Sequence, residues 1–334
     1  MNLAQITRQA QYQAGLIKQA GTAGSFVSSY ELDAWANRGN DILERTLRSI
    51  REDWFVKKMT STDTTAQFLQ GVSYTPTALS LTTSAIEYTL PPDLMSIKAI
   101  RCVTANYEET KFRLRDRSSG RFGYEHRTES TDTVSPPGEE ITVTVYGART
   151  LLLARYLDTA LDIEILYTTK TKQLVRYSTG TITATDASTS IAGSGTTWTY
   201  LPLDSDFLDM HFGTSASATV PNAEPHYFYD GVYRARVASI TDADTLVLSR
   251  NKVGALAAGT GYLLASLPQS PEEYHQAIAD YVTAQILFKA KSESAKFWFG
   301  QFTDTMGAAK GALSRKQSED IETVEDWNPD AAEY

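Results

Sequence analysis

The stretch that decides the fold is SSYELDAWANRGNDILERTLRSI, residues 28–50, which predicts a long amphipathic helix. Ser28 and Glu31 have the spacing of a capping box, in which the serine oxygen accepts a bond from a free backbone N–H and the glutamate reaches back. The apolar positions that follow recur at helical period; they are Leu32, Trp35, Ala36, Leu43, Leu47 and Ile50. We therefore expect one face of this helix to be buried against other parts of the chain.

Further helices are predicted at both ends of the chain. A first helix is indicated by apolar residues three and four apart, namely Leu3, Ile6, Ala10, Ala14 and Ile17. Helical signals return at Ser270, a predicted cap, with Pro271 at the first helical position and Glu273 three residues after the cap. We therefore expect helices both before and after the middle of the chain.

A last helix carries a heptad-like apolar seam. Its candidate seam residues are Ala295, Phe299, Phe302, Met306, Ala309 and Leu313. The seam fits a helix packed against the N-terminal helices, or a helix–helix contact between neighbouring subunits. Both alternatives remain open at the level of sequence.

The middle of the chain is rich in strand signals. Residues 86–90 alternate in polarity and stop at Pro91-Pro92, as a half-buried strand does. Residues 178–266 are rich in threonine, which favours pleated surfaces, and include strand-like runs at 233–240 and 245–248. We interpret this second segment as a small β-sandwich or barrel.

These patterns predict an α+β fold with an interrupted helical part. Residues 1–60 and 268–317 are expected to form one helical bundle, and residues 61–177 a central antiparallel β domain. Residues 178–266 are the predicted inserted β-sandwich or barrel, and residues 318–334 an acidic C-terminal tail.

Composition excludes several classes of protein. The 334 residues carry a formal net charge of −9, which argues against a nucleic-acid binder over the whole surface. The single Cys102 excludes a disulfide framework within the chain and a cysteine-based zinc site. No apolar run reaches the roughly 20 residues of a membrane helix, and Met1–Arg8 lacks the apolar core of a signal peptide. We expect a soluble protein made inside the cell, without a membrane partner.

Catalytic and metal-binding motifs are absent from the sequence. There is no nucleophile elbow, phosphate loop, dinucleotide fingerprint or H-E-x-x-H. Asp204–His211 holds three carboxylates and a histidine, but it lacks calcium-loop spacing, so we interpret it as a polar turn rather than a divalent-ion site. We predict no enzyme activity, no catalytic residue, no metal and no cofactor, although a pair of distant carboxylates would leave no local signature.

A basic stripe is predicted between residues 111 and 117. Lys111, Arg113, Arg115 and Arg117 lie two apart and would share one face of a strand. Basic residues of this kind can protect a sheet edge in solvent. Alternatively, they can hold phosphates of DNA or an acidic protein segment.

The C-terminal tail, Ser318–Tyr334, holds most of the net charge. It contains seven acidic residues and no Lys or Arg, and so accounts for −7 of the total −9. Such a segment is too polar to form its own core, and an aromatic anchor within it fits a segment that orders on a protein partner. The candidate partner-binding residues are Ile321, Val324, Asp326, Trp327, Asn328, Pro329 and Tyr334.

Three stretches together resemble the head-to-tail adaptor (connector) proteins of tailed bacteriophages, including the tail tubular proteins of short-tailed phages. Tyr30–Leu43 resembles the family's N-terminal helix pattern of leucine, two residues, tryptophan, one residue and asparagine. Tyr88–Ile97 is similar to its Y-x-L-P-x-D-x-x-x-I strand end, and Pro268–Tyr281 to its return to helix. The segment 178–266 departs from the minimal family plan, which leaves its role open.

The resemblance implies a structural protein of the virion. Such adaptors form a ring, usually of twelve copies, beneath the portal, where they extend the DNA channel used in genome ejection and dock a tail tube, nozzle or fibres. It implies assembly in the host cytoplasm, a final place at the head–tail interface, and a C-terminal segment that binds the portal protein. It also leaves open a non-specific contact with genomic DNA in the channel.

A second class of function also fits the composition. A β-rich tail fibre or receptor-binding protein could carry helices at its ends. Fibre proteins usually show repeats and trimeric seams, and the sequence shows neither.

Overall fold

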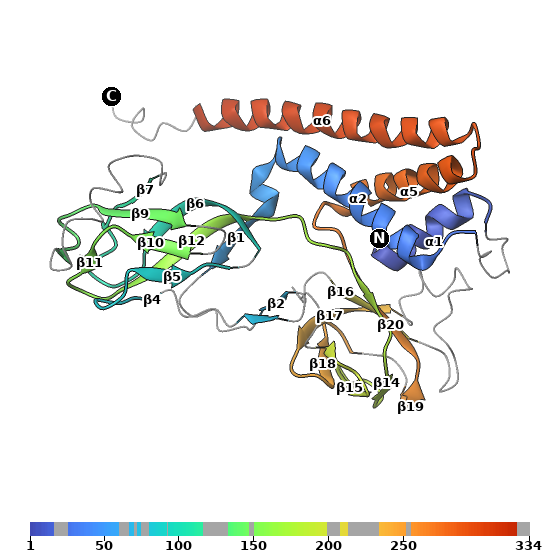
Figure 1. Cartoon of the computed structure of the whole chain (residues 1–334), viewed down its shortest axis with the longest axis horizontal. Helices are drawn as coiled ribbons and strands as arrows, with labels where there is room; N and C mark the ends of the chain where they lie inside the picture. Colours follow the sequence, from blue (N-terminus) through green and yellow to red (C-terminus); the bar gives the residue numbers. More distant parts are fainter. Residues whose placement is uncertain are drawn as a thin grey trace, which may run out of the picture. The chain divides into compact units, whose positions relative to one another are not determined.

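The structure is a computed structural model with a mixed α+β fold, and its described part divides into two compact units (Figure 1). Unit 1 takes both ends of the chain, as Met1–Trp54, Thr171–Thr199 and Leu203–Tyr334, and unit 2 is chiefly Phe55–Lys170. The structure describes residues 1–16, 26–59, 67–69, 72–74, 80–91, 93–115, 133–146, 150–198, 208–212, 234–251 and 255–325.

Unit 1 contains the four α-helices of the described residues. They are α1 (Leu3–Gln13), α2 (Ser29–Arg48), α5 (His275–Lys289) and α6 (Ala295–Glu325). The predicted capping box of α2 is confirmed, because the Ser28 hydroxyl accepts from the Glu31 N–H at 3.2 Å and the Glu31 carboxylate accepts from the Ser28 N–H at 2.9 Å. The helix α1 begins with a second capping box, made by Asn2 and Gln5.

The helix α5 packs against α1, α2 and α6. Its apolar residues occur around most of its circumference, as expected of a helix with neighbours on several sides. Gly39 of α2 lies directly over Tyr281, and a Cβ added there would stand only 2.9 Å from the ring. The glycine thus allows α2 and α5 to approach closely.

The predicted start of α5 is wrong in detail. A 3-10 turn, η4 (Glu272–Tyr274), comes first, and α5 begins only at His275, without a side-chain cap. The Ser270 hydroxyl does not cap the helix, whereas its carbonyl lies 2.7 Å from the His275 ring nitrogen Nε2. Pro271 fixes the extended backbone before the turn rather than the first residue of the helix.

Unit 2 is built from two four-stranded sheets and shorter pairs. One sheet has the order β1-β12-β4, with β6 also paired to β12, and the other has the order β5-β10-β9-β7. Pairings between described strands of this unit are antiparallel, except β7–β9 and β8–β11, which are parallel. The strands are β1 (Val56–Met59), β2 (Gln67–Leu69), β3 (Val72–Tyr74), β4 (Ser80–Leu81), β5 (Glu87–Thr89), β6 (Leu94–Cys102), β7 (Phe112–Leu114), β8 (Thr133–Val134), β9 (Ile141–Tyr146), β10 (Thr150–Leu153), β11 (Tyr156–Leu157) and β12 (Leu161–Thr169).

The β-rich part of unit 1 is one eight-stranded sheet of order β13-β20-β16-β17-β18-β15-β14-β19. Its strands are β13 (Arg176–Tyr177), β14 (Thr181–Ala184), β15 (Ser190–Ser194), β16 (Leu208–Phe212), β17 (Arg234–Ile240), β18 (Thr245–Leu248), β19 (Leu256–Thr260) and β20 (Tyr262–Ser266). Every residue of β16 and β20 is buried, so both faces of these two strands are covered. On one face, Leu263 and Ala265 pack against Ala4 of α1.

The prediction of a polar turn at Asp204–His211 is wrong for its second half. Leu208–Phe212 is the strand β16, and Asp209 and His211 are each only 2% exposed. These two side chains point toward Asn2, while Leu208, Met210 and Phe212 alternate with them along the strand. Residues 204–207 lie outside the described residues.

Candidate interaction surfaces

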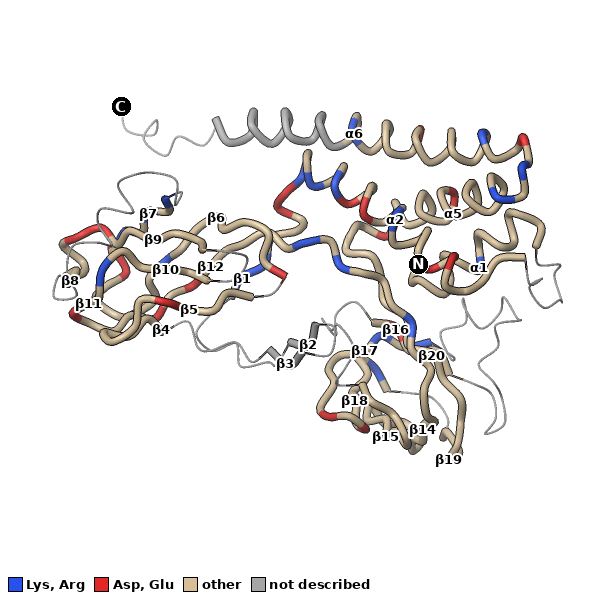
Figure 2. The backbone as a smooth tube through the Cα atoms, viewed as in Figure 1, with Lys and Arg blue, Asp and Glu red and all other residues tan. Residues whose placement is uncertain are grey.

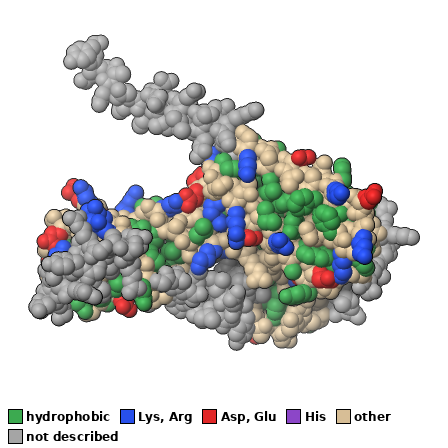
Figure 3. All heavy atoms as spheres, turned by 45° about the horizontal axis from the view of Figure 1, so that its top comes forward, with side chains coloured by type: hydrophobic (Ala, Val, Ile, Leu, Met, Phe, Trp, Pro, Cys, Tyr) green, Lys and Arg blue, Asp and Glu red, His purple; other side chains and the backbone are tan. Residues whose placement is uncertain are grey.

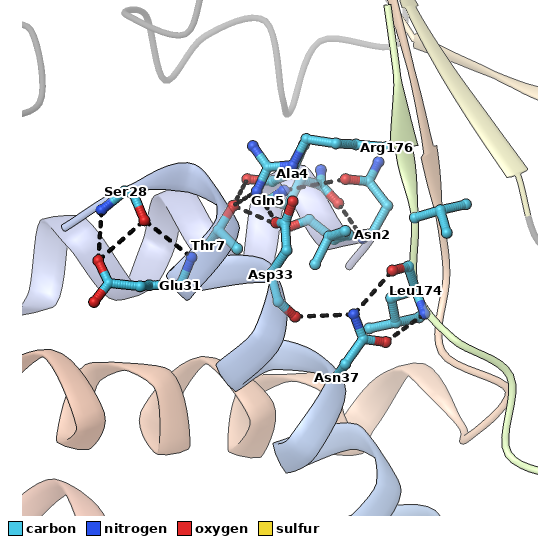
Figure 4. A network of polar contacts seen from close by, with 12 residues as sticks. Asn2, Ala4, Gln5, Thr7, Ser28, Glu31, Asp33, Asn37, Leu174 and Arg176 are labelled. Carbon is cyan, nitrogen blue, oxygen red and sulfur yellow. Dashed lines mark hydrogen bonds and ion pairs between the residues drawn. The ribbon is translucent and has the colours of Figure 1, made fainter.

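A row of polar side chains on α2 holds a crossing segment of unit 1 in place. The side chain of Asn37 donates from Nδ2 to the Leu174 carbonyl at 3.0 Å and accepts at Oδ1 from the Leu174 N–H at 2.6 Å (Figure 4). One amide therefore satisfies both backbone groups of Leu174, as a neighbouring strand would. Close by, Asp33 pairs with Arg176, whose guanidinium also donates to the Thr7 hydroxyl at 3.2 Å.

The same row continues toward the end of α2. Asn40 donates to the Lys172 carbonyl at 3.4 Å, and Arg48 donates to the Thr171 hydroxyl at 3.3 Å. Between them, the buried Glu44 accepts at 3.0 Å from the Gln269 N–H. Burial raises the pKa of Glu44 to about 7, although the Gln269 N–H and the Arg48 guanidinium 4.0 Å away favour its ionised form. We call this row, Asn37, Asn40, Glu44 and Arg48, the α2 polar row.

A second buried network surrounds the start of α1. Asn2 donates from Nδ2 to Asp209 at 3.2 Å, and the same atom lies 2.6 Å from Nε2 of His211. Arg234 and Arg236 each approach the Asp209 carboxylate at 3.7 Å, so the buried charge has cationic neighbours. Desolvation lowers the pKa of His275, the first residue of α5, to about 4. The network joins α1 to the sheet.

Neither network has the form of a metal site. No group of three or more His, Cys, Asp or Glu side chains is arranged to hold an ion within the described ranges. None of the helices in those ranges combines the length and apolar character that a membrane crossing requires.

The basic stripe lies at the edge of a sheet in unit 2. Its central residues belong to β7 or flank it, and β7 is the terminal strand of its four-stranded sheet. Lys111 and Arg113 are exposed, whereas Arg115 is half-buried. Arg113 reaches Glu140 at 3.4 Å, in a pair whose side chains are both about half exposed. Arg117 lies outside the described residues, so the structure brings together three of the four predicted residues.

The helix seam faces the inside of unit 1 for most of its length. Ala295, Phe302 and Ala309 are buried, and Phe302 packs against Tyr281 with ring centroids 5.1 Å apart. Met306 is half-buried and lies 3.9 Å from the Thr46 hydroxyl of α2. Phe299 is 40% exposed. The side chain of Leu313 lies outside the described part, although its backbone belongs to α6.

The acidic tail is only partly within the structure. The helix α6 continues to Glu325, past the boundary expected at residue 317, so Ile321 and Val324 belong to a helix by their backbone. Asp326, Trp327, Asn328, Pro329 and Tyr334 lie outside the described residues.

Part of the predicted seam belongs to a partly exposed apolar face between α2 and α6. Phe288 at the end of α5 is 46% exposed and meets Phe299 edge to face, with ring centroids 6.3 Å apart. Ile42 and Met306 are partly buried beside the Tyr281–Phe302 cluster. Figure 3 shows hydrophobic side chains gathered on the side of the molecule that carries α6, with Lys and Arg around them. We call Ile42, Phe288, Phe299 and Met306 the α2–α6 face. Phe299 and Met306 are predicted seam residues, whereas Ile42 and Phe288 lie outside the predicted seam.

The comparisons with known proteins give little support to any assignment. No protein-family model matches the chain, and no curated protein matches it. Among solved structures, the flagellar hook junction protein FlgK from Burkholderia pseudomallei is 10% identical, with a TM-score of 0.14. That match covers 86% of this chain and 60% of FlgK, so the chain spans less than two thirds of that protein. A TM-score this low carries no argument about fold or function.

Proposed function

We propose that this chain is a structural protein of a tailed-bacteriophage virion, a head-to-tail adaptor without catalytic activity. Copies of it would form a ring beneath the portal, extend the DNA channel and dock tail components. The finer fold belongs to the same proposal: a bundle of N- and C-terminal helices, a central β domain, and an inserted β-sandwich or barrel. Its partners would be other copies, the portal protein, and tail tube, nozzle or fibre proteins, with the assembly located at the head–tail interface.

The observation that carries the proposal is a long-range contact made by the adaptor-like stretch Tyr30–Leu43. Its asparagine, Asn37, bonds both backbone groups of Leu174, more than 130 positions later. The stretch that resembles the family therefore fixes the point where the chain returns to the helices of unit 1. Helices from both ends of the chain pack around α5, which is compatible with a common helical base.

A closed ring sets a further requirement on the chain. Identical subunits close a ring through a heterologous interface, in which one face of a subunit meets a different face of its neighbour. Unit 1 carries the exposed α2–α6 face, and the chain carries the acidic segment 318–334, which differ in chemistry.

Mass measurement of the full-length protein, alone and mixed with purified portal rings, tests the proposal. We expect a discrete complex of one portal ring with a ring of this protein, and no such species in either component alone. A matched mixture with the variant Asp53→Ala, which removes only an exposed carboxylate paired with Arg51, should give the same complex. Stable trimers that ignore the portal would contradict the proposal and favour the tail-fibre alternative.

A further inference from the structure

The α2–α6 face is an exposed apolar surface with a basic rim. Phe288 and Phe299 meet edge to face, and Phe299 in turn contacts Phe302 with ring centroids 6.2 Å apart. Ile42 and Met306 extend the surface along α2 and α6. Contiguous exposed apolar side chains are a common mark of a protein–protein contact.

Basic side chains from three helices surround this face. Arg38 is exposed and close enough to Tyr281 to influence that phenol electrostatically, and Lys310 lies one turn beyond Met306. Arg45 pairs with Asp41 at 2.8 Å, and Lys289 with Glu31 at 2.7 Å. Basic side chains thus border the face on α2, α5 and α6. Figure 2 shows basic residues along both α2 and α6.

The acidic segment 318–334 has the complementary chemistry. It holds seven carboxylates and no basic residue. Its apolar residues Ile321, Val324 and Trp327 are three apart, a spacing that places them on one side of a helix. An amphipathic helix laid with its apolar side on an exposed hydrophobic surface is a recurrent mode of recognition.

The segment cannot reach the face of its own chain. Met306 and Ile321 both belong to the continuous helix α6, and fifteen residues of helix separate them by about 22 Å. Val324 lies farther along the same helix. Trp327 follows the helix by two residues, which extend over only about 7 Å. Trp327 can therefore meet this face only on another copy of the chain.

We infer that the acidic segment Ser318–Tyr334 of one copy docks on the α2–α6 face of a second copy, with Trp327 near Phe299 and the carboxylates against Arg38 and Arg45. The inference deepens the proposed function, because it names the two different faces that a ring interface needs. The portal, which sequence analysis named as the partner of this segment, becomes the alternative outcome of the test.

Cross-linking between two differently marked copies tests this docking. Full-length protein with Trp327→Cys is mixed with full-length protein carrying Phe299→Cys, under mild oxidation. The only native cysteine, Cys102, is buried and serves as the unreactive background. We expect a covalent pair of copies, since a disulfide needs Cβ atoms about 4 Å apart. Phe297→Cys is the matched control: it is 60% exposed on the same turn of α6 but points to the opposite side, and it should not cross-link.

Several results would overturn the inference. These are no covalent pair, equal pairing with Phe297→Cys, or cross-linking of Trp327→Cys to added portal protein with none between copies. The last result would still support the adaptor function. Conversely, a specific pair of copies in an assembly that ignores the portal would support the docking and contradict the adaptor function.

A binding measurement keeps the test independent of the cysteine variants. A labelled peptide of residues 316–334 is titrated with full-length protein carrying Arg38→Glu and Arg45→Glu, both at exposed positions. We expect at least a tenfold weaker affinity than for the unchanged protein, and weaker binding at high salt. The control protein carries Lys111→Glu and Arg113→Glu in unit 2. These substitutions change the net charge by the same amount and should leave the affinity for the peptide unchanged. Equal affinity for both double variants would contradict the docking.

Discussion

The core of unit 2 and the α2 polar row of unit 1 hold distant segments together by opposite means. In unit 2, Ile163, Ile165 and Tyr167 of β12 lie in one continuous apolar cluster and are at most 2% exposed. Along α2, Asn37 and Glu44 hold segments near residues 174 and 269 by hydrogen bonds to backbone groups. Apolar burial stabilises unit 2 through contacts that depend little on direction. The α2 polar row stabilises unit 1 through hydrogen bonds, which require particular distances and angles.

The apolar core and the polar row should differ in how well they tolerate substitution. An apolar core tolerates exchanges of similar volume, because its contacts depend little on direction. A buried polar row tolerates few exchanges, since removal of one partner leaves the other without a hydrogen bond in a dry place. We therefore expect the two regions to respond differently to substitution, and the predictions below test that difference.

The largest effect is expected from Ile165→Ala in unit 2. Ile165 is fully buried in the central strand β12, so its removal should lower the free energy of unfolding of unit 2 by about 3 to 4 kcal/mol. Hydrogen exchange of β6 and β12 amides measures this. All five tryptophans lie outside residues 55–170, so their fluorescence reports unit 1 and should show an unchanged transition. An equal shift in hydrogen exchange and in tryptophan fluorescence would contradict the prediction, because the two units would then unfold together.

Asn37→Ala should give the next largest effect, in unit 1. The substitution leaves the N–H and C=O of Leu174 without the partner they have now, which should lower the free energy of unfolding by about 2 to 3 kcal/mol. Urea unfolding followed by tryptophan fluorescence measures it. Asp41→Ala is the control on the same helix: it removes only an exposed pair with Arg45 and should change stability by about 0.5 kcal/mol or less. Similar losses of stability in the two variants would show that the Asn37–Leu174 hydrogen bonds stabilise unit 1 no more than an exposed ion pair does.

Sequence patterns predicted local elements better than contacts between distant segments. The capping box at Ser28 and the strand at 245–248 follow from local signals, and both agree with the structure. The roles of Asn37, Glu44 and Asp209 could not be predicted, because their partners are backbone groups or side chains far away in the sequence. A polar residue on a helix or a strand is ordinarily solvated. Nothing local distinguishes Asn37, which is bonded to Leu174, from Asp41, which pairs with Arg45 on the same helix.

The pH dependence of stability isolates Glu44 within the polar row. Burial raises its pKa from 4.5 to about 7, so between these pH values the folded protein holds a proton that the unfolded chain has released. The contribution of Glu44 to the free energy of unfolding is therefore full below pH 4.5 and is lost as the pH rises to about 7, a change of about 3 kcal/mol. Glu44→Gln should remove this dependence from tryptophan-monitored unfolding.

The comparison with Glu44→Gln is needed because His275 titrates nearby with the opposite sign. Burial lowers the pKa of His275 to about 4, so between there and 6.5 the unfolded chain binds the extra proton and stability rises with pH. The His275 contribution is present in both the unchanged protein and Glu44→Gln, so it cancels when the pH profile of one is subtracted from that of the other. Identical pH profiles for the two proteins would contradict the assignment to Glu44.

The smallest effect on stability is expected at the basic stripe, where neither apolar burial nor a buried polar bond is at stake. Lys111 and Arg113 are exposed, and Arg113 pairs only loosely with Glu140, so Lys111→Glu with Arg113→Glu should change the free energy of unfolding of unit 2 by about 0.5 kcal/mol or less. Arg115 is left unchanged because it is half-buried. Since stability is preserved, particle yield and DNA retention then decide between the two roles left open by the sequence. A normal yield would assign the stripe to protection of the β7 edge, whereas a reduced yield from an equally stable protein would assign it to contact with a partner or with DNA.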